Sequence, residues 1–436
     1  MMRSMFSGVS GLRTHQTKMD VIAHNISNVN TVGFKSSRVT FNDVFSQTVQ
    51  GASRANDNTG RGGTNAMQIG LGVNVASIDK NMSTGAAQRT DRALDVMING
   101  DGFFIVSDGS GQFFTRAGAF EVDAAGNLHM NGMRVNGWDI DDDWNIVRDQ
   151  VSPINLGGFK ESSPPEVSTE IRVEGNLNAD AVRANGGTPP THISSISIFD
   201  SLGNRWVVEA RFELGTSAAG VTEWEVNFGT QAFLNGDRRS TPVTIANPGP
   251  VAIEFDDQGR LIPGGGDLTA GSVTLDFGSP NFPTAATIGD GGDIEFDFSF
   301  LNQFGSMVTN ASFDTRNGAA PGTLEGLSVG SDGIITGRYS NGDMRTLGQI
   351  AIATFRNPAG LEAVGNNLFA TSPNSGEFNG QGVETSNIMG GVLEMSNVDL
   401  SAEFTEMITT QRGFQASSRL ITTSDEMLQE LVNLRR

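Results

Sequence analysis

The last forty residues of this chain, 397–436, carry the pattern that most restricts how the chain folds. Apolar side chains return there at every seventh position. They are Leu400, Met407, Phe414, Ile421 and Leu428, with Phe404 on the flank of the same stripe. A seven-residue apolar repeat of this length is typical of an α-helix that pairs with another helix along a coiled-coil-like seam. Ser396 and Asp399 have the spacing of a capping box, which predicts a helix start just before Leu400.

The seam of this helix is not purely apolar. Gln411, Ser418 and Asp425 occupy its companion heptad positions. Gly413 lies in the middle of the helix, where glycine should cost about 1 kcal/mol relative to alanine. A helix of this composition therefore needs a partner to persist in water.

The first thirty residues predict that partner. Their small, apolar and uncharged side chains follow one another at alternating spacings of four and three. These positions are Met5, Val9, Leu12, Gln16, Met19, Ala23 and Ile26. The spacing predicts a second helix with a narrow apolar stripe. Both helices could pack on an ordinary globular core. Because they lie at opposite ends of a β-like sequence, they favour self-assembly instead.

Composition predicts a mainly β protein between the helices. The 436 residues are too many for one hydrophobic core, and the 55 glycines with frequent Val, Ile, Phe and Thr are typical of short strands and turns. The net charge of −20 argues against nucleic acid and anionic membrane surfaces as partners, because phosphates would be repelled. No cofactor is implied.

Three further patterns restrict chemistry and location. The chain has no cysteine, which excludes disulfides and thiolate metal sites. No apolar run approaches the roughly 18 residues of a membrane span, so no membrane insertion is expected. The first residues have polar breaks where a cleaved signal peptide would need its apolar core. The protein is therefore expected either to stay in the cytoplasm or to leave it without a cleaved signal.

One short motif is specific enough to suggest a family. It follows the first predicted helix and contains Asn25, Asn28, Thr31, Gly33, Phe34 and Lys35. This run resembles the N-terminal signature of the bacterial flagellar axial proteins, the rod and hook family. His24 stands where that family usually has asparagine. Further similarity, including Gln411 and Arg412, extends the resemblance over about residues 1–150 and 318–436.

The resemblance implies a layered domain organisation. Residues 1–35 and 396–436 would form an inner domain of terminal helices, and 36–90 an extended connecting segment. Residues 91–158 and 318–392 would form one β-rich middle domain. Residues 159–317 would be an inserted β-rich outer domain. Rod proteins lack an insertion of this size, whereas it is similar to the outer domain of hook members of the family.

The function implied by the resemblance is structural. Copies of the chain would form a curved tube between rod and filament, outside the cell in the hook and basal body, after export without a cleaved signal. Implied partners are the chain itself, the rod, hook-cap and hook–filament junction proteins, and the flagellar export apparatus. The residues expected to carry assembly are Val9, Leu12, Met19, Ile26, Leu400, Phe404, Met407, Phe414, Ile421 and Leu428.

Alternative functions have weaker support in the residues. A distal-rod protein of the same family would be straight and stiff. A secreted β-rich carbohydrate-active or adhesive protein is another class, since a pair of catalytic carboxylates can be far apart in sequence. Ser328 lies in a nucleophile-elbow pattern, but no histidine follows it to act as base. Asp139 to Asn145 begins like a calcium loop, yet Trp144 replaces its required glycine. We therefore expect no enzyme.

Overall fold

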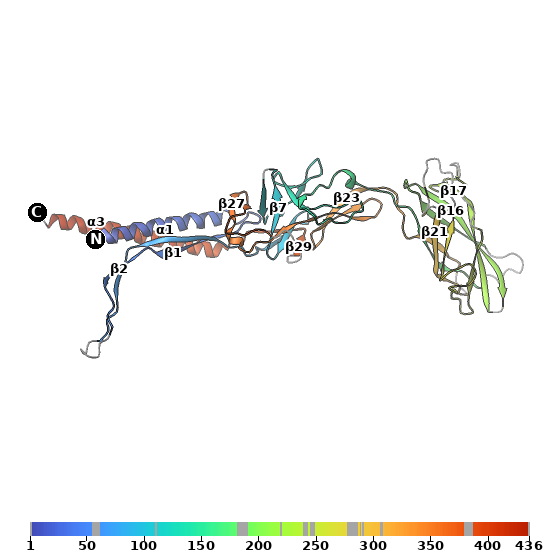
Figure 1. The fold of residues 1–436 in the computed structure, drawn as a ribbon, viewed down its shortest axis with the longest axis horizontal. Coiled ribbons are helices and arrows are strands. Elements are labelled where there is room, and N and C mark those ends of the chain that lie inside the picture. Colours follow the sequence, from blue (N-terminus) through green and yellow to red (C-terminus); the bar gives the residue numbers. More distant parts are fainter. Residues whose placement is uncertain are drawn as a thin grey trace. The chain divides into compact units, whose positions relative to one another are not determined.

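The computed structural model shows a strand-rich chain with one long helix at each end, which confirms the predicted fold class (Figure 1). It divides into two compact units, which are described separately below. The first comprises Met1–Gly157, Leu327–Gly337 and Arg345–Arg436, and the second comprises Gly158–Gly326 and Arg338–Met344. The structure describes residues 2–54, 62–109, 111–180, 191–218, 220–238, 243–244, 249–276, 287, 289, 292–305, 308–378 and 387–434.

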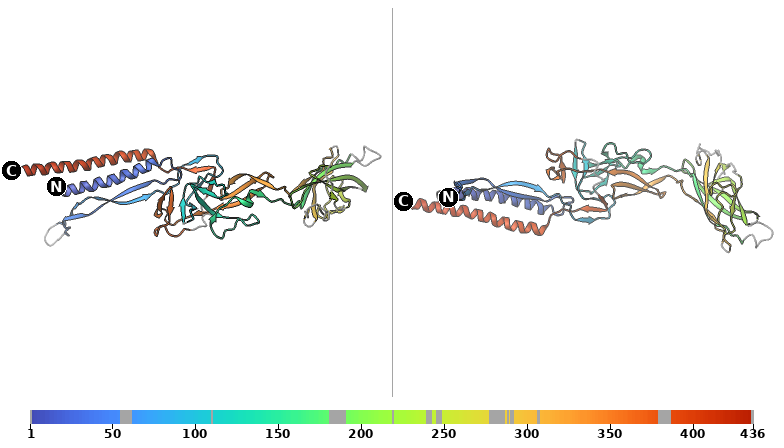
Figure 2. Two further views of the ribbon diagram at one scale, coloured as in Figure 1. Left: turned by 90° about the horizontal axis from the view of Figure 1, so that it is seen from above. Right: turned by 60° about the horizontal axis from the view of Figure 1, so that its bottom comes forward.

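The terminal helices, α1 (Met2–Ser27) and α3 (Leu400–Asn433), lie side by side and run antiparallel (Figures 1 and 2). Asp399 begins α3, because its side chain accepts hydrogen bonds from the backbone N–H groups of Ser401 and Ala402. Ser396 instead accepts from Val398, so the expected capping box is wrong although the expected start is right.

The contact between the two helices lies one position away from the predicted stripe on α1. Its residues include Ser4, Gly8, Gly11, His15, Lys18 and Asn25, and the buried Ile22 occupies the remaining position of this four-three series. On α3 the companion positions are Glu403, Ser417 and Ser424 rather than Gln411, Ser418 and Asp425. The predicted position Val9 is 37% exposed. At Gly8 and Gly11 the reason is steric, because a glycine lets the partner helix approach more closely than a larger residue would.

Glycines set this close approach. A Cβ atom added to Gly8 would lie 3.1 Å from Cγ1 of Ile421 and 3.3 Å from the carbonyl oxygen of Ser417. A Cβ atom on Gly413 would lie 2.7 Å from the ring of His15. The expected cost of Gly413 within the helix is thus offset by the space that it leaves for the partner helix.

The segment after α1 forms pairs of antiparallel strands. β1 (Ser37–Asp43) pairs antiparallel with β4 (Val73–Lys80), and β2 (Ser46–Gln50) with β3 (Met67–Gly70). The first ladder packs on α1, because Ser10 accepts a hydrogen bond from the Val73 N–H and the His15 ring meets that of Phe41 edge-on. β5 (Ala87–Arg89) pairs with β30 (Val392–Glu394), near the start of α3.

The rest of the first unit is a β-rich body built from both halves of the chain. β6 (Val96–Asn99) pairs with β29 (Asn387–Gly390), and β11 (Met133–Trp138) with β25 (Met344–Ile350). β6 and β29 form a two-stranded sheet of their own, whereas the sheet of β11 and β25 also contains β7 (Phe103–Ser107), β8 (Gln112–Thr115), β9 (Glu121–Val122), β10 (Leu128–Met130), β12 (Ser152–Pro153), β26 (Ile352–Ala353), β27 (Glu362–Gly365) and β28 (Leu368–Ala370). A short helix, η2, spans Pro358–Gly360. Phe103, Phe114 and Trp138 lie in the core of this β-rich body.

The second unit contains two sheets that share one core. The first has the order β20 (Ser272–Asp276), β21 (Asp293–Asn302), β14 (Glu170–Asn176) and β22 (Ser312–Thr315). The second has β15 (Thr191–Phe199), β16 (Arg205–Ala218), β17 (Val221–Leu234) and β18 (Val243–Thr244), with β19 (Val251–Phe255) also on β17. Phe212 of the second sheet lies 5.5 Å from Phe313 of the first, between ring centroids, so the sheets pack face to face.

The chain enters and leaves this two-sheet core along one ladder. The Arg316 N–H donates to the carbonyl oxygen of Glu170 at 3.2 Å. On the way in, the chain forms η1 (Gly158–Glu161) and β13 (Ser162–Ser163). On the way out it forms β23 (Gly322–Val329), which pairs with β13, and then β24 (Ile334–Tyr339). The proposed range 159–317 for an inserted domain thus includes part of this connecting ladder.

We predict that Gly8→Val loosens the helix pair. The added side chain collides with Ile421 and with backbone of α3, and overpacking of this kind costs about 1–3 kcal/mol. Amide hydrogen exchange should therefore speed up along α1 and α3. Ala23→Val, at an exposed position of the same helix, is the control for placing a valine side chain where no partner helix meets it. Equal exchange in the two variants would contradict the close-approach argument.

Candidate assembly site

Glu394, at the end of β30, lies at the junction between the terminal helices and the β-rich body. Its side chain is 0% exposed. One carboxylate oxygen accepts from Lys35 Nζ at 2.6 Å and from the Gly85 N–H at 2.8 Å. The other accepts from Arg116 at 3.5 Å. One buried anion thus connects the loop after α1, the chain before β5 and the chain after β8.

Burial and the neighbouring charge shift the pKa values of the two cations of this cluster in opposite directions. Loss of water lowers the pKa of both Lys35 and Arg116, while the carboxylate of Glu394 raises each one again. Backbone carbonyls supply further acceptors, Ser83 for Lys35 at 2.7 Å and Gly100 for Arg116 at 2.8 Å, while the buried Nε of Arg116 has no partner among the described residues. A buried charge cluster of this kind is stable only while every member has its partners.

Two asparagines complete the junction. Asn25 donates to Glu403 at 2.9 Å and exchanges hydrogen bonds with the backbone of Ser37, so it connects α1, α3 and β1. Asn397 accepts from the Ser36 N–H at 2.8 Å and donates to the Asn81 carbonyl at 2.8 Å. Burial raises the pKa of Glu403, an effect that the Asn25 amide partly reverses.

The other signature residues shape the loop after α1. Thr31 donates to Asn28 at 3.1 Å, and the Phe34 ring meets the His24 ring edge-on at 5.4 Å. Gly33 has a left-handed backbone (φ 69°), and a Cβ atom there would lie 2.6 Å from the Ala117 nitrogen. Glycine is therefore required at this position. The other two motif residues, Gln411 and Arg412, are exposed on α3.

Two surfaces of the first unit expose apolar side chains. On the helices these include Val9, Leu400, Phe404 and Ile408, of which Phe404 is 50% exposed. On the β2–β3 hairpin and beside it they are Val44, Phe45, Val49, Met67 and Ile69. Met407, Phe414, Ile421 and Leu428 are half-buried, as are Leu12, Met19 and Ile26. The predicted assembly positions thus divide between the contact inside the chain and the surface of the helix pair.

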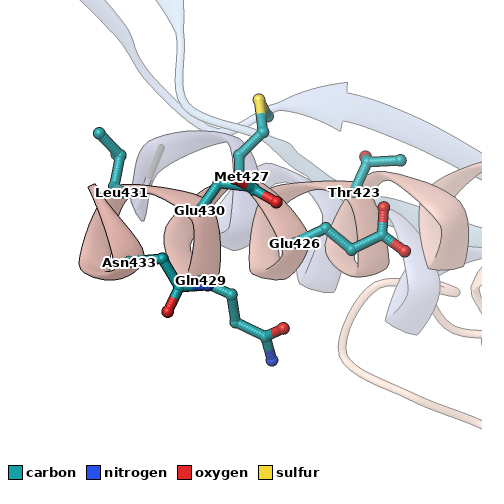
Figure 3. Close-up of a pocket in the computed structure, with 7 residues that line it drawn as sticks. All are labelled: Thr423, Glu426, Met427, Gln429, Glu430, Leu431 and Asn433. Carbon is teal, nitrogen blue, oxygen red and sulfur yellow. The ribbon is translucent and has the colours of Figure 1, made fainter. Parts of the chain in front are cut away.

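The last turns of α3 form an open surface. Figure 3 shows seven side chains there, among them Met427 and Leu431, and they point to different sides of one helix. Met427 is 50% and Leu431 48% exposed. Since a single helix supplies every wall, this region is an accessible helix end rather than a substrate cavity.

The described ranges show no metal site and no membrane-spanning helix. No group of three or more His, Asp or Glu side chains converges there as metal ligands would. The Asp139–Asn145 segment is a hairpin turn in which Asp141 accepts from the Asn145 N–H at 2.7 Å. Neither α1 nor α3 has a stretch apolar enough to cross a bilayer.

Four family descriptions match successive parts of the chain. They are "Flagella basal body rod protein" at residues 5–35, "Flagellar hook protein FlgE/F/G D1 domain" at 97–186, "Flagellar basal body protein FlaE D2 domain" at 176–319 and "Flagellar basal body rod FlgEFG protein C-terminal" at 389–434.

Individual relatives match over the whole length. The flagellar hook protein FlgE of Borreliella burgdorferi is 38% identical and that of Treponema pallidum 37%, each with 100% of both chains covered. The chain belongs to the flagellar hook protein family. It is a structural protein of the bacterial flagellum, in the hook. The basal-body rod protein FlgG of Bacillus subtilis is 31% identical, again over 100% of both chains, so the expectation that rod proteins lack an insertion of this size is wrong for that protein. The crystal structure of Helicobacter pylori hook protein FlgE2 has a TM-score of 0.47 and 15% identity, covering 71% of this chain and 100% of that one.

The hook-family signature therefore has a structural basis that its spacing did not reveal. Asn25 and Lys35 belong to the sequence motif, whereas no sequence pattern predicts Arg116 and Glu394 as site residues. Glu394 lies two residues before the Ser396–Leu400 run of the C-terminal segment. Nothing in the sequence around a single glutamate in a strand indicates that it is buried. Only the tertiary structure shows that Glu394 pairs with Lys35 of the signature.

We predict that Glu394→Gln strongly destabilises the first unit. Glutamine keeps the shape of the side chain but leaves Lys35 and Arg116 buried without an anion, which costs about 3–5 kcal/mol. The midpoint of urea unfolding measures the loss. Glu121→Gln is the matched control, because Glu121 forms an exposed ion pair with Arg92. Similar midpoints for both variants would show that the cluster contributes no more than a surface pair.

We also predict that the helix pair weakens in mild acid. Burial, together with the charge of Lys18, lowers the pKa of His15 below its ordinary value of 6.5. The unfolded chain then binds the proton more tightly than the folded one, so this stability is present above about pH 6.5 and is lost as the pH falls. Between about pH 7 and pH 5, the melting temperature should fall more steeply for the wild type than for His15→Gln. Parallel curves would exclude His15 as the cause.

Proposed function

We propose that copies of this chain assemble with one another into the curved, tubular hook between rod and filament. The observation that carries the proposal is the apolar surface of the β2–β3 hairpin and its flanks. Its five large apolar side chains are between 48% and 65% exposed. A two-stranded hairpin is at best marginally stable in water, and its edges offer unpaired backbone groups. A neighbouring copy would cover both.

The helix pair supports the same proposal. Its inner contact includes glycines, serines and charged groups, and several larger apolar residues, such as Phe404 and Ile408, remain exposed on the outside. Val9 on α1, with Leu400 and Phe404 on α3, are exposed, and we assign them to contacts between copies. The half-buried positions would serve both contacts: Leu12, Met19, Ile26, Met407, Phe414, Ile421 and Leu428.

Charge separates the assembling part from the rest. Residues 159–317 contain 21 acidic and 9 basic residues, a net charge of −12 out of −20 for the whole chain. Copies of this segment repel one another at low salt. Such surfaces can slide past each other, as a tube that bends during rotation requires, while the apolar helices hold the subunits together.

The finer partners follow from family membership. We propose that the chain contacts the rod, the hook cap and the hook–filament junction proteins, that the flagellar export apparatus delivers it outside the cell, and that no cleaved signal is used. A distal-rod protein remains the second candidate, because the Bacillus subtilis rod protein matches over the full length. Electron microscopy of the polymer discriminates the two, since a hook is curved and a rod is straight.

We predict that Phe404→Asp abolishes polymerisation without weakening the monomer. Burying this side chain between copies is worth about 1.5–3 kcal/mol, and an unpaired carboxylate in its place adds a desolvation cost at every subunit. Tubes should be absent by electron microscopy where the wild type forms them. Thr405→Asp adds the same charge at the adjacent exposed position and should still polymerise. A large fall in the melting temperature of Phe404→Asp would instead place this residue in the core of the monomer.

A further inference from the structure

We propose that an open pocket beside the signature loop is a receptor for a carboxylate side chain of a second copy of this chain, and that Lys80 is its recognition residue. The inference rests on the proposed self-assembly. This contact would fix the orientation of two neighbouring copies, which non-directional apolar contacts alone do not.

The pocket has a volume of about 440 Å³ and lies between the end of α1, the end of β4 and two hairpin turns. Its walls include His24 and Asn28 from the helix, Lys80 from β4, Asn131 from the β10–β11 turn and Asn366 from the β27–β28 turn. These residues belong to one compact unit, so the pocket exists within a single folded body.

Its polar groups are suited to an anion. Among the described residues that line the pocket, none is acidic. Lys35 also faces it, but this lysine is already held by Glu394. The left-handed backbones of Asn131 (φ 49°) and Asn366 (φ 51°) account for asparagine at those turns. Their side-chain amides form no hydrogen bond within the described part of the chain, so both remain available as donors.

Lys80 is the group that packing does not explain. Its Nζ lies 4.7 Å from the centre of the Phe369 ring, and no ion pair to it is found in the described ranges. Burial alone lowers its pKa. An aromatic face attracts a cation but does not neutralise it, so a half-buried ammonium group without a carboxylate is a costly arrangement for a monomer. A carboxylate entering the pocket would remove that cost.

The chemistry of the chain identifies the occupant. The protein carries 49 acidic and 29 basic residues, so each copy offers its neighbours a large excess of carboxylates. An inorganic anion could offer similar oxygen atoms, and the experiment below separates the two sources.

The first test removes the charge. In Lys80→Met the critical concentration for polymerisation should rise about tenfold, as expected for loss of a partly desolvated ion pair. Lys80→Arg should stay within about threefold of the wild type because it keeps the charge. Arg89→Met removes an equally positive but exposed side chain and should have little effect. A critical concentration for Lys80→Met equal to that of the wild type overturns the proposal. Failure of the wild type itself to polymerise refutes the proposed function instead.

The second test identifies the occupant. Because the chain has no cysteine, Lys80→Cys can carry a photo-crosslinker at one site. The labelled variant is mixed at low proportion into ¹⁵N-labelled wild type, polymerised and irradiated. Mass spectrometry should find crosslinks to ¹⁵N peptides that contain Asp or Glu. Crosslinks confined to the labelled chain overturn the proposal, as does a Lys80 amine resonance that shifts on adding inorganic phosphate to the monomer but is unchanged in the polymer.

Discussion

The burial of Glu394 between Lys35 and Arg116 holds the two ends of the chain to the β-rich body. A carboxylate removed from water is tolerated only while both cations and the surrounding backbone donors and acceptors stay in place. Lys35 follows the first helix and Glu394 precedes the last, so both ends must be folded together for the cluster to exist. The base of the helix pair is therefore positioned by charge, whereas its length is held by close packing.

That close packing determines which apolar side chains of the helix pair stay exposed on its surface. Gly8 lies against Ile421 and Gly11 against Ser417, so the two helices are too near for a large side chain at either glycine. Phe404 and Val9 consequently remain in contact with water. A stable monomer would ordinarily bury such residues, and a subunit that assembles would use them. The same choice of small residues thus supports both the fold of one chain and the proposed contact between chains.

Much of this architecture was predictable because its signals are local. The heptad of α3, the four-three spacing of α1 and the alternation of short apolar runs with glycine turns each report a backbone period. The signature around Asn25 and Lys35 likewise indicated the flagellar axial family, which the comparisons confirm. Those signals are carried by neighbouring residues, so no knowledge of distant contacts was needed to read them.

The register of the helix pair and the composition of the junction were decided by tertiary structure. Periodicity reports that a helix has an apolar stripe, but the face that meets the partner is chosen by how closely the backbones approach, and glycines at 8, 11 and 413 moved it by one position on α1. Lys35 and Glu394 lie 359 residues apart. No spacing within a segment links them, because their attraction exists only after the chain has brought both into a place without water.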